Sequence, residues 1–85
     1  MAERKVTVTS EVGLHARPAA TFVQTAAKAP FDVMIAKVDG PPVNAKSILA
    51  VLSLDVEQGD FIVVSAEGEG ADELLDQLVE IVSAP

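Results

Sequence analysis

The chain has 85 residues, 49% of them hydrophobic, with a formal net charge of −7, one histidine and no cysteine. This length predicts a single domain over residues 1–85. The acidic charge argues against binding to nucleic acid, and the lack of cysteine excludes disulfides and argues against a structural zinc site. No apolar run is long enough to span a membrane and no apolar signal core follows the charged first residues, so we expect a cytoplasmic protein without membrane insertion.

The first part of the chain predicts two strands separated by a helix. Residues 5–9 alternate between polar and apolar side chains, which predicts a strand with Val6 and Val8 facing inward. A turn over residues 10–13 leads to a helix from Ala16 to about Lys28, with a core face at helical spacing made of Ala19, Phe22, Val23 and Ala26. Pro30 ends this helix, and residues 32–38 predict the second strand, with Val33 and Ile35 in the core.

The second part predicts two more strands and two more helices. The Asp-Gly-Pro-Pro run at residues 39–42 predicts a turn, followed by a short edge strand at residues 43–44. Ser47 is expected to cap a short helix over residues 48–54, with Val51 and Leu54 facing the core. After a turn at residues 58–60, we expect a strand at residues 61–66 and a closing helix at residues 71–83, whose apolar stripe comprises Leu74, Leu75, Leu78, Ile81 and Val82.

This order of elements, βαββαβα, predicts a two-layer α+β sandwich. The sheet is expected to be antiparallel, with one face covered by helices and the other facing water. On that open face, the alternation of the strands predicts a strip of apolar side chains, namely Met34, Ala36, Phe61 and Val63.

The candidate functional residue is the lone histidine, His15, which stands just before Arg17 and Pro18. Proline fits the first turn of a helix, so His15 is predicted to stand at a helix N-terminus, where unpaired N–H groups and the helix dipole favour an anion such as phosphate. A lone histidine is more often a surface residue or a cap. Arg17, Lys28 and Lys46 are expected to gather near His15 as a local basic face on the acidic protein.

Two motifs carry a resemblance to a known family. Residues 13–19, Gly-Leu-His-Ala-Arg-Pro-Ala, resemble the phosphorylation-site motif of HPr, the histidine-containing phosphocarrier of the bacterial sugar phosphotransferase system. Residues 43–54 resemble the regulatory-serine helix of that family, in the form typical of its Gram-positive members. The resemblance runs from about Val6 to Val82, and it implies an open-faced β-sandwich with sheet order 1-4-2-3 and three helices on one side.

The resemblance also implies a function, that of a phosphoryl carrier and not of an enzyme with turnover. His15 would accept a phosphoryl group through Nδ1 from phosphorylated enzyme I, which takes it from phosphoenolpyruvate, and pass it to IIA domains of sugar permeases. Arg17 and the backbone N–H groups of Ala16 and Arg17 would stabilise the phosphate. No cofactor or metal is expected, and we expect a monomer.

For Ser47, two interpretations stay open: phosphorylation by an HPr kinase/phosphorylase, with a transcriptional regulator as a further partner, or a role as helix cap alone. The family's docking positions imply a patch formed by Ala20, Gln24, Ile48, Leu49 and Leu52, with Arg17, Lys28 and Lys46 at its rim. Ordinary burial is the alternative. Two departures stand out: the turn at residues 39–42 is one residue longer than in many members, and Gln24 and Ala50 stand where some members have lysine.

Two other functions compete with the carrier. One is a regulatory module that acts mainly through Ser47, against which His15 argues, because relatives that only regulate usually lack that histidine. The other is a small ligand-binding or structural domain without phosphoryl chemistry. The presence of both motifs in the right order argues against it.

Overall fold

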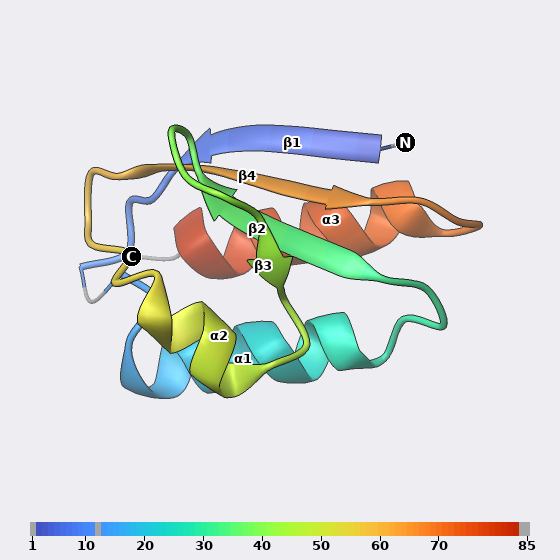
Figure 1. The fold of residues 1–85 in the computed structure, drawn as a ribbon, viewed down its shortest axis with the longest axis horizontal. Helices are drawn as coiled ribbons and strands as arrows, with labels where there is room; N and C mark the ends of the chain where they lie inside the picture. Colours follow the sequence, from blue (N-terminus) through green and yellow to red (C-terminus); the bar gives the residue numbers. More distant parts are fainter. Residues whose placement is uncertain (1, 12, 84–85) are drawn as a thin grey trace.

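The computed structural model describes residues 2–11 and 13–83, which form a four-stranded sheet with three helices packed on one face (Figure 1). In chain order the elements are β1 (Ala2–Thr7), α1 (Ala16–Ala27), β2 (Val33–Lys37), β3 (Val43–Asn44), α2 (Ile48–Ser53), β4 (Phe61–Ala66) and α3 (Ala71–Ser83). The sheet order β1-β4-β2-β3 confirms the predicted α+β open-faced sandwich.

The sheet is antiparallel throughout, and β4 lies between β1 and β2. In this register Ile62 faces Val6 on one side, and Val64 faces Ile35 on the other. Because side chains alternate along a strand, the inward face collects the buried residues Val33, Ile35, Ile62, Val64 and Ala66. β3 pairs only with β2, which confirms the edge position that Pro41 and Pro42 predicted.

β1 differs from the predicted strand in its limits. It begins at Ala2 instead of Lys5 and ends at Thr7, although Val8 remains fully buried and its N–H donates to the Asp60 carbonyl at 2.8 Å. The sequence pattern did not predict the earlier start because Arg4, a charged residue, stands at a position of β1 that faces inward. Its guanidinium remains partly exposed and pairs with Asp72 and Asp76 of α3, at 3.1 and 3.2 Å.

The core lies between the sheet and the helices. α3 contributes Leu74, Leu75, Leu78 and Val82, and α1 contributes Ala19, Phe22 and Ala26, as their spacing predicted. The other predicted core residues are half-buried and pack against this core: Val23, Leu54 and Ile81. On the other face of the sheet, Met34, Ala36 and Val63 are half-buried and Phe61 is exposed, which confirms the predicted apolar strip.

The packing of α1 and α2 determines which residues meet at the functional end of the molecule. The two short helices lie side by side, and the N-terminus of α1 lies at the same end as the C-terminus of α2 (Figure 1). The loop that enters α1 therefore meets the segment that leaves α2.

Candidate functional site

His15 is the residue that begins α1. It occupies the N-cap position with an extended backbone (φ −121°, ψ 159°) and makes no side-chain capping hydrogen bond. The first N–H groups of a helix have no partner within it, so the N–H groups of Ala16 and Arg17 face the open end of α1. Pro18, in the first turn, has no N–H to leave unpaired. The sequence prediction for His15, a histidine at a helix N-terminus, is confirmed.

The loop before His15 is fixed against the segment that follows α2. Gly13 has φ +59°, and a Cβ at this position would collide with the carbonyl oxygen of Val56. The N–H of Leu14 donates to the same oxygen at 3.0 Å, and the side chains of Leu14 and Val56 are both fully buried. Close backbone contact thus sets the position of His15 relative to residues 55–57.

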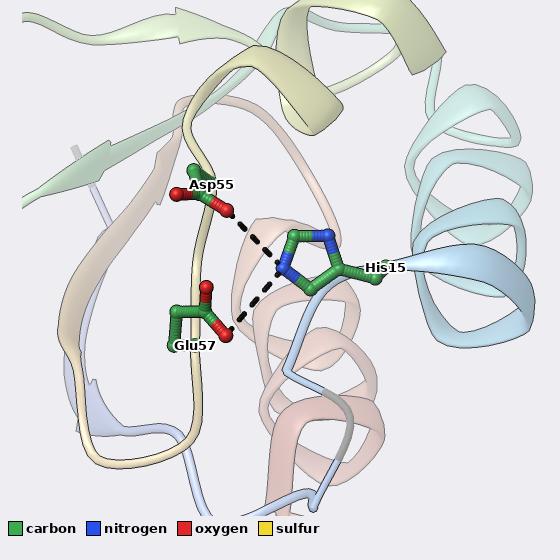
Figure 2. Close-up of side chains that lie close together, drawn as sticks. All are labelled: His15, Asp55 and Glu57. Carbon is green, nitrogen blue, oxygen red and sulfur yellow. Dashed lines mark ion pairs between the residues drawn. The ribbon is translucent and has the colours of Figure 1, made fainter.

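Two carboxylates flank the imidazole as a result. Val56 is fully buried, whereas its neighbours Asp55 and Glu57 are exposed and their side chains point toward His15. His15 Nε2 lies 3.4 Å from Asp55 Oδ1 and 3.9 Å from Glu57 Oε1, distances at which a protonated imidazole pairs with carboxylates (Figure 2). The other ring nitrogen, Nδ1, is turned away from both carboxylates in Figure 2.

The backbone around these carboxylates is also ordered by specific interactions. Asp55 adopts φ +52°, a left-handed conformation that aspartate tolerates better than most residues. The N–H of Glu57 donates to Asp60 Oδ2 at 2.8 Å, and this hydrogen bond, together with the weaker effect of Lys37 at 3.4 Å, holds the pKa of the Asp60 carboxyl below its usual value despite partial desolvation.

His15, Asp55 and Glu57 each offer one ligand atom, and these atoms lie within 4.8 Å of one another. One nitrogen and two oxygens form a donor set that a divalent cation accepts. The side chains are open to water, however, with exposed fractions of 38%, 70% and 63%. Carboxylates this exposed are stable without a cation, so the distances alone do not define a metal centre.

The predicted basic face around His15 is wrong. Lys28 stands at the far end of α1, whose 12 residues span about 18 Å, and Lys46 Nζ donates to the Ala29 carbonyl at 2.8 Å, at that same far end. Of the three basic residues, only Arg17 lies near His15, and its side chain is exposed. Among the residues that the structure describes, the carboxylates of Asp55 and Glu57 lie within 4 Å of the imidazole Nε2, and the sequence analysis did not predict them. The alternation of Asp55, Val56 and Glu57 indicates only that both acids point outward.

Ser47 caps α2, as predicted. Its Oγ accepts a hydrogen bond from the Ala50 N–H at 3.3 Å. The 6 residues of α2, about 9 Å along the axis, separate Ser47 from the end of the helix that approaches His15. Ser47 is therefore a second position on the same side of the molecule and does not touch the imidazole.

α2 also carries apolar side chains that the core does not use. Ile48 and Leu52 are exposed, and Leu49 is 78% exposed, while Val51 on the opposite side of the helix is fully buried. Ala20 and Gln24 lie on the neighbouring helix α1, half-buried and exposed respectively.

Among the residues that the structure describes, no helix is long and apolar enough to cross a membrane.

Comparison with known proteins identifies the family. The family model for the PTS HPr component phosphorylation site matches residues 2–84. The chain belongs to the HPr family. It is 49% identical over 83 residues to the phosphocarrier protein HPr of Streptomyces coelicolor, covering 98% of this chain and 89% of that protein. It is also 45% identical over 82 residues to the HPr-like protein Crh of Bacillus subtilis, covering 96% of this chain and 95% of that protein.

Solved HPr structures agree with this assignment. The crystal structure of an HPr from Bacillus anthracis matches with a TM-score of 0.90 at 43% identity, covering 96% of each chain. As a member of the HPr family, the chain has the general role of a phosphocarrier in the phosphotransferase system, and a phosphocarrier is not a catalyst in the usual sense.

Proposed function

We propose that His15 accepts a phosphoryl group from phosphorylated enzyme I, which takes it from phosphoenolpyruvate, and passes it to IIA domains of sugar permeases. The observation that carries this proposal is the position of the imidazole: it precedes the open N-terminus of α1, with Nδ1 turned away from the two carboxylates. A neutral imidazole with its proton on Nε2 has a lone pair on Nδ1, which is the nucleophile that phosphoryl acceptance needs.

The surroundings of His15 suit a transferable phosphate. The N–H groups of Ala16 and Arg17 and the positive end of the α1 dipole favour an anion at this place. The exposed guanidinium of Arg17 offers a planar pair of donors that fits phosphate oxygens. The imidazole is 38% exposed, so a partner protein can bring its own phosphorylated group within reach. Phosphoryl transfer depends mainly on such positioning and charge stabilisation.

The docking surface proposed for enzyme I and the IIA domains is the exposed apolar side of α2 together with the adjoining part of α1. Ile48, Leu49 and Leu52 supply its apolar centre, and Ala20 and Gln24 extend it along α1 toward His15. Lys28 and Lys46 form its rim at the far end of α1, and Arg17 forms its rim beside His15. We propose that the protein acts in the cytoplasm as a monomer, which leaves this surface free.

Regulation through Ser47 is a second proposal, favoured by the position of its hydroxyl. Ser47 Oγ lies at the N-terminus of α2, where a phosphate dianion is stabilised by the helix dipole. Phosphorylation there by an HPr kinase/phosphorylase would add negative charge next to Ile48 and Leu49. The phosphorylated protein would then bind a transcriptional regulator and would dock less readily with its relay partners.

Intact-mass spectrometry tests the main proposal. The protein is incubated with phosphoenolpyruvate and purified enzyme I, in parallel with a His15→Ala variant whose folding is checked by circular dichroism. We expect one added, acid-labile phosphate on the wild type and none on the variant. Phosphorylation of a folded His15→Ala protein, or none on the wild type while enzyme I phosphorylates another carrier, would refute the assignment.

A further inference from the structure

The carboxylates of Asp55 and Glu57 take no part in the acceptance of a phosphoryl group by Nδ1. Phosphoryl acceptance uses Nδ1 and the end of α1, whereas both carboxylates lie against the other ring nitrogen, Nε2. Negative charge next to a site that must bind phosphate is unfavourable in itself, because like charges repel. We therefore consider what two negative charges beside Nε2 contribute once His15 is phosphorylated.

We infer that Asp55 and Glu57 are positioning residues for the transfer step: their carboxylates hold a proton on Nε2 of phosphorylated His15, and this proton keeps the imidazole a good leaving group. The inference rests on the proposed phosphorylation of His15.

The chemistry of the N–P bond shows why this proton matters. When an acceptor or water attacks the phosphorus, the bond between phosphorus and Nδ1 breaks and its electron pair returns to Nδ1. With a proton on Nε2, the group that leaves is neutral imidazole. Without that proton it would be an imidazolate anion, a far poorer leaving group. In the reverse direction the lone pair of Nδ1 attacks the donor's phosphorus, and the ring that keeps its Nε2 proton gains positive charge, which the two carboxylates stabilise.

The two carboxylates are held in place by the backbone. The Leu14 N–H bonds to the Val56 carbonyl at 3.0 Å, and the close approach of Gly13 keeps the two segments in contact. The Glu57 N–H bonds to Asp60 Oδ2 at 2.8 Å, which fixes the residue from its other side. The approach of both carboxylates to Nε2 is thus a consequence of buried neighbours and backbone hydrogen bonds.

Other charges near the site act differently. On α1, Arg17 and the helix dipole oppose positive charge on the imidazole but stabilise the phosphate. Glu11 lies in the loop that leads to His15, and Asp60 is engaged by the Glu57 N–H and Lys37. Among the described residues, Asp55 and Glu57 are the acids with a carboxylate oxygen within 4 Å of Nε2. Their exposure limits the effect of each to about fivefold on the protonation equilibrium, the value for unit charges 4 Å apart in water.

The test measures how fast phosphorylated His15 loses its phosphate, as a function of pH. Asp55→Asn, Glu57→Gln and the double variant remove the charges with little change of shape, and asparagine tolerates the left-handed backbone at position 55. Glu67→Gln combined with Glu69→Gln is the matched control. It removes two charges from the exposed loop beside Gly68, which contacts Phe31 at the far end of α1.

Each protein is phosphorylated by enzyme I and, separately, by phosphoramidate, a small chemical donor for histidine. The loss of phosphate is followed by ³¹P NMR from about pH 5 to about pH 8. The rate of phosphate loss is expected to fall as the pH rises and Nε2 loses its proton, over the same pH range in the wild type and the control. In the double variant we expect this decrease in rate at lower pH. Its hydrolysis should be about fivefold or more slower than that of the wild type at the alkaline end of the range and unchanged at the acid end.

An identical pH profile for the double variant and the wild type would overturn the inference, and so would equal slowing in the control. Phosphorylation by phosphoramidate but not by enzyme I would refute the relay proposal while leaving the role of the carboxylates testable. If neither donor phosphorylates His15, both the relay proposal and the role inferred for the two carboxylates are refuted.

Discussion

Gly13→Ala is expected to destabilise the protein and to displace His15. Gly13 has φ +59°, a conformation that costs an alanine about 1 kcal/mol. The added Cβ would also collide with the Val56 carbonyl, a backbone atom that cannot turn aside as a flexible side chain can. The hydrogen bond from Leu14 N–H to that oxygen would stretch or break, at a further cost of about 1 kcal/mol. When the cost of relieving the steric overlap is added, the total loss in free energy of unfolding is about 2–4 kcal/mol. This is a large part of the ~5–15 kcal/mol that stabilises a small domain.

Gly59→Ala provides a matched control for the backbone effect. Gly59 also has positive φ, +94°, but a Cβ there would meet nothing within 4 Å. Urea denaturation followed by circular dichroism measures both variants. We expect a larger decrease in the unfolding midpoint for Gly13→Ala than for Gly59→Ala, with unchanged slopes, and slower phosphorylation of Gly13→Ala by enzyme I under conditions where it is folded. Equal destabilisation by the two substitutions would show that contact with Val56 does not position the His15 loop.

Three other predictions follow from single side chains. Ser47→Ala removes the cap of α2 and should lower the free energy of unfolding by about 1 kcal/mol, whereas Ser47→Asp, which can still cap, should lose less, as urea denaturation would show. Leu49→Asp should change stability by less than about 0.5 kcal/mol, because the side chain is exposed, but should raise the KM for phosphorylation by enzyme I; an unchanged KM would place docking elsewhere. The hydrogen bond from the Glu57 N–H lowers the pKa of Asp60, so its contribution is present above the usual value of 3.8 and lost as pH falls through the lower folded value. Asp60→Asn should therefore weaken the loss of stability in acid, measured by thermal denaturation at several pH values.

Much of the fold could be predicted because its signals are local. Ser47 caps the helix that it precedes, and Pro41 and Pro42 precede the edge strand that they predicted. The start of β1 could not be predicted in this way. Arg4 occupies an inward position of the strand because its guanidinium stays partly exposed and pairs with Asp72 and Asp76, which come 68 and 72 residues later.

The same distinction between local signals and tertiary contacts applies to the candidate site. His15 at the start of α1 follows from neighbouring residues, and it was predicted correctly. The charges around it depend on tertiary structure. Asp55 and Glu57 reach the imidazole because Leu14 bonds to Val56, a contact between segments far apart in the sequence. The predicted basic face failed for two reasons. The length of α1, which the sequence did predict, separates Lys28 from His15, and a tertiary contact with the Ala29 carbonyl holds Lys46 at that same far end.

The most direct test of the central claim is the site of the N–P bond within the imidazole ring. Two-dimensional ¹H–¹⁵N NMR of the phosphorylated, ¹⁵N-labelled protein distinguishes the two ring nitrogens of His15 through their couplings to the ring protons. We predict that the phosphoryl group is on Nδ1 and that Nε2, which faces Asp55 and Glu57, carries a proton. Phosphorylation on Nε2, or on a residue other than His15, would contradict the mechanism.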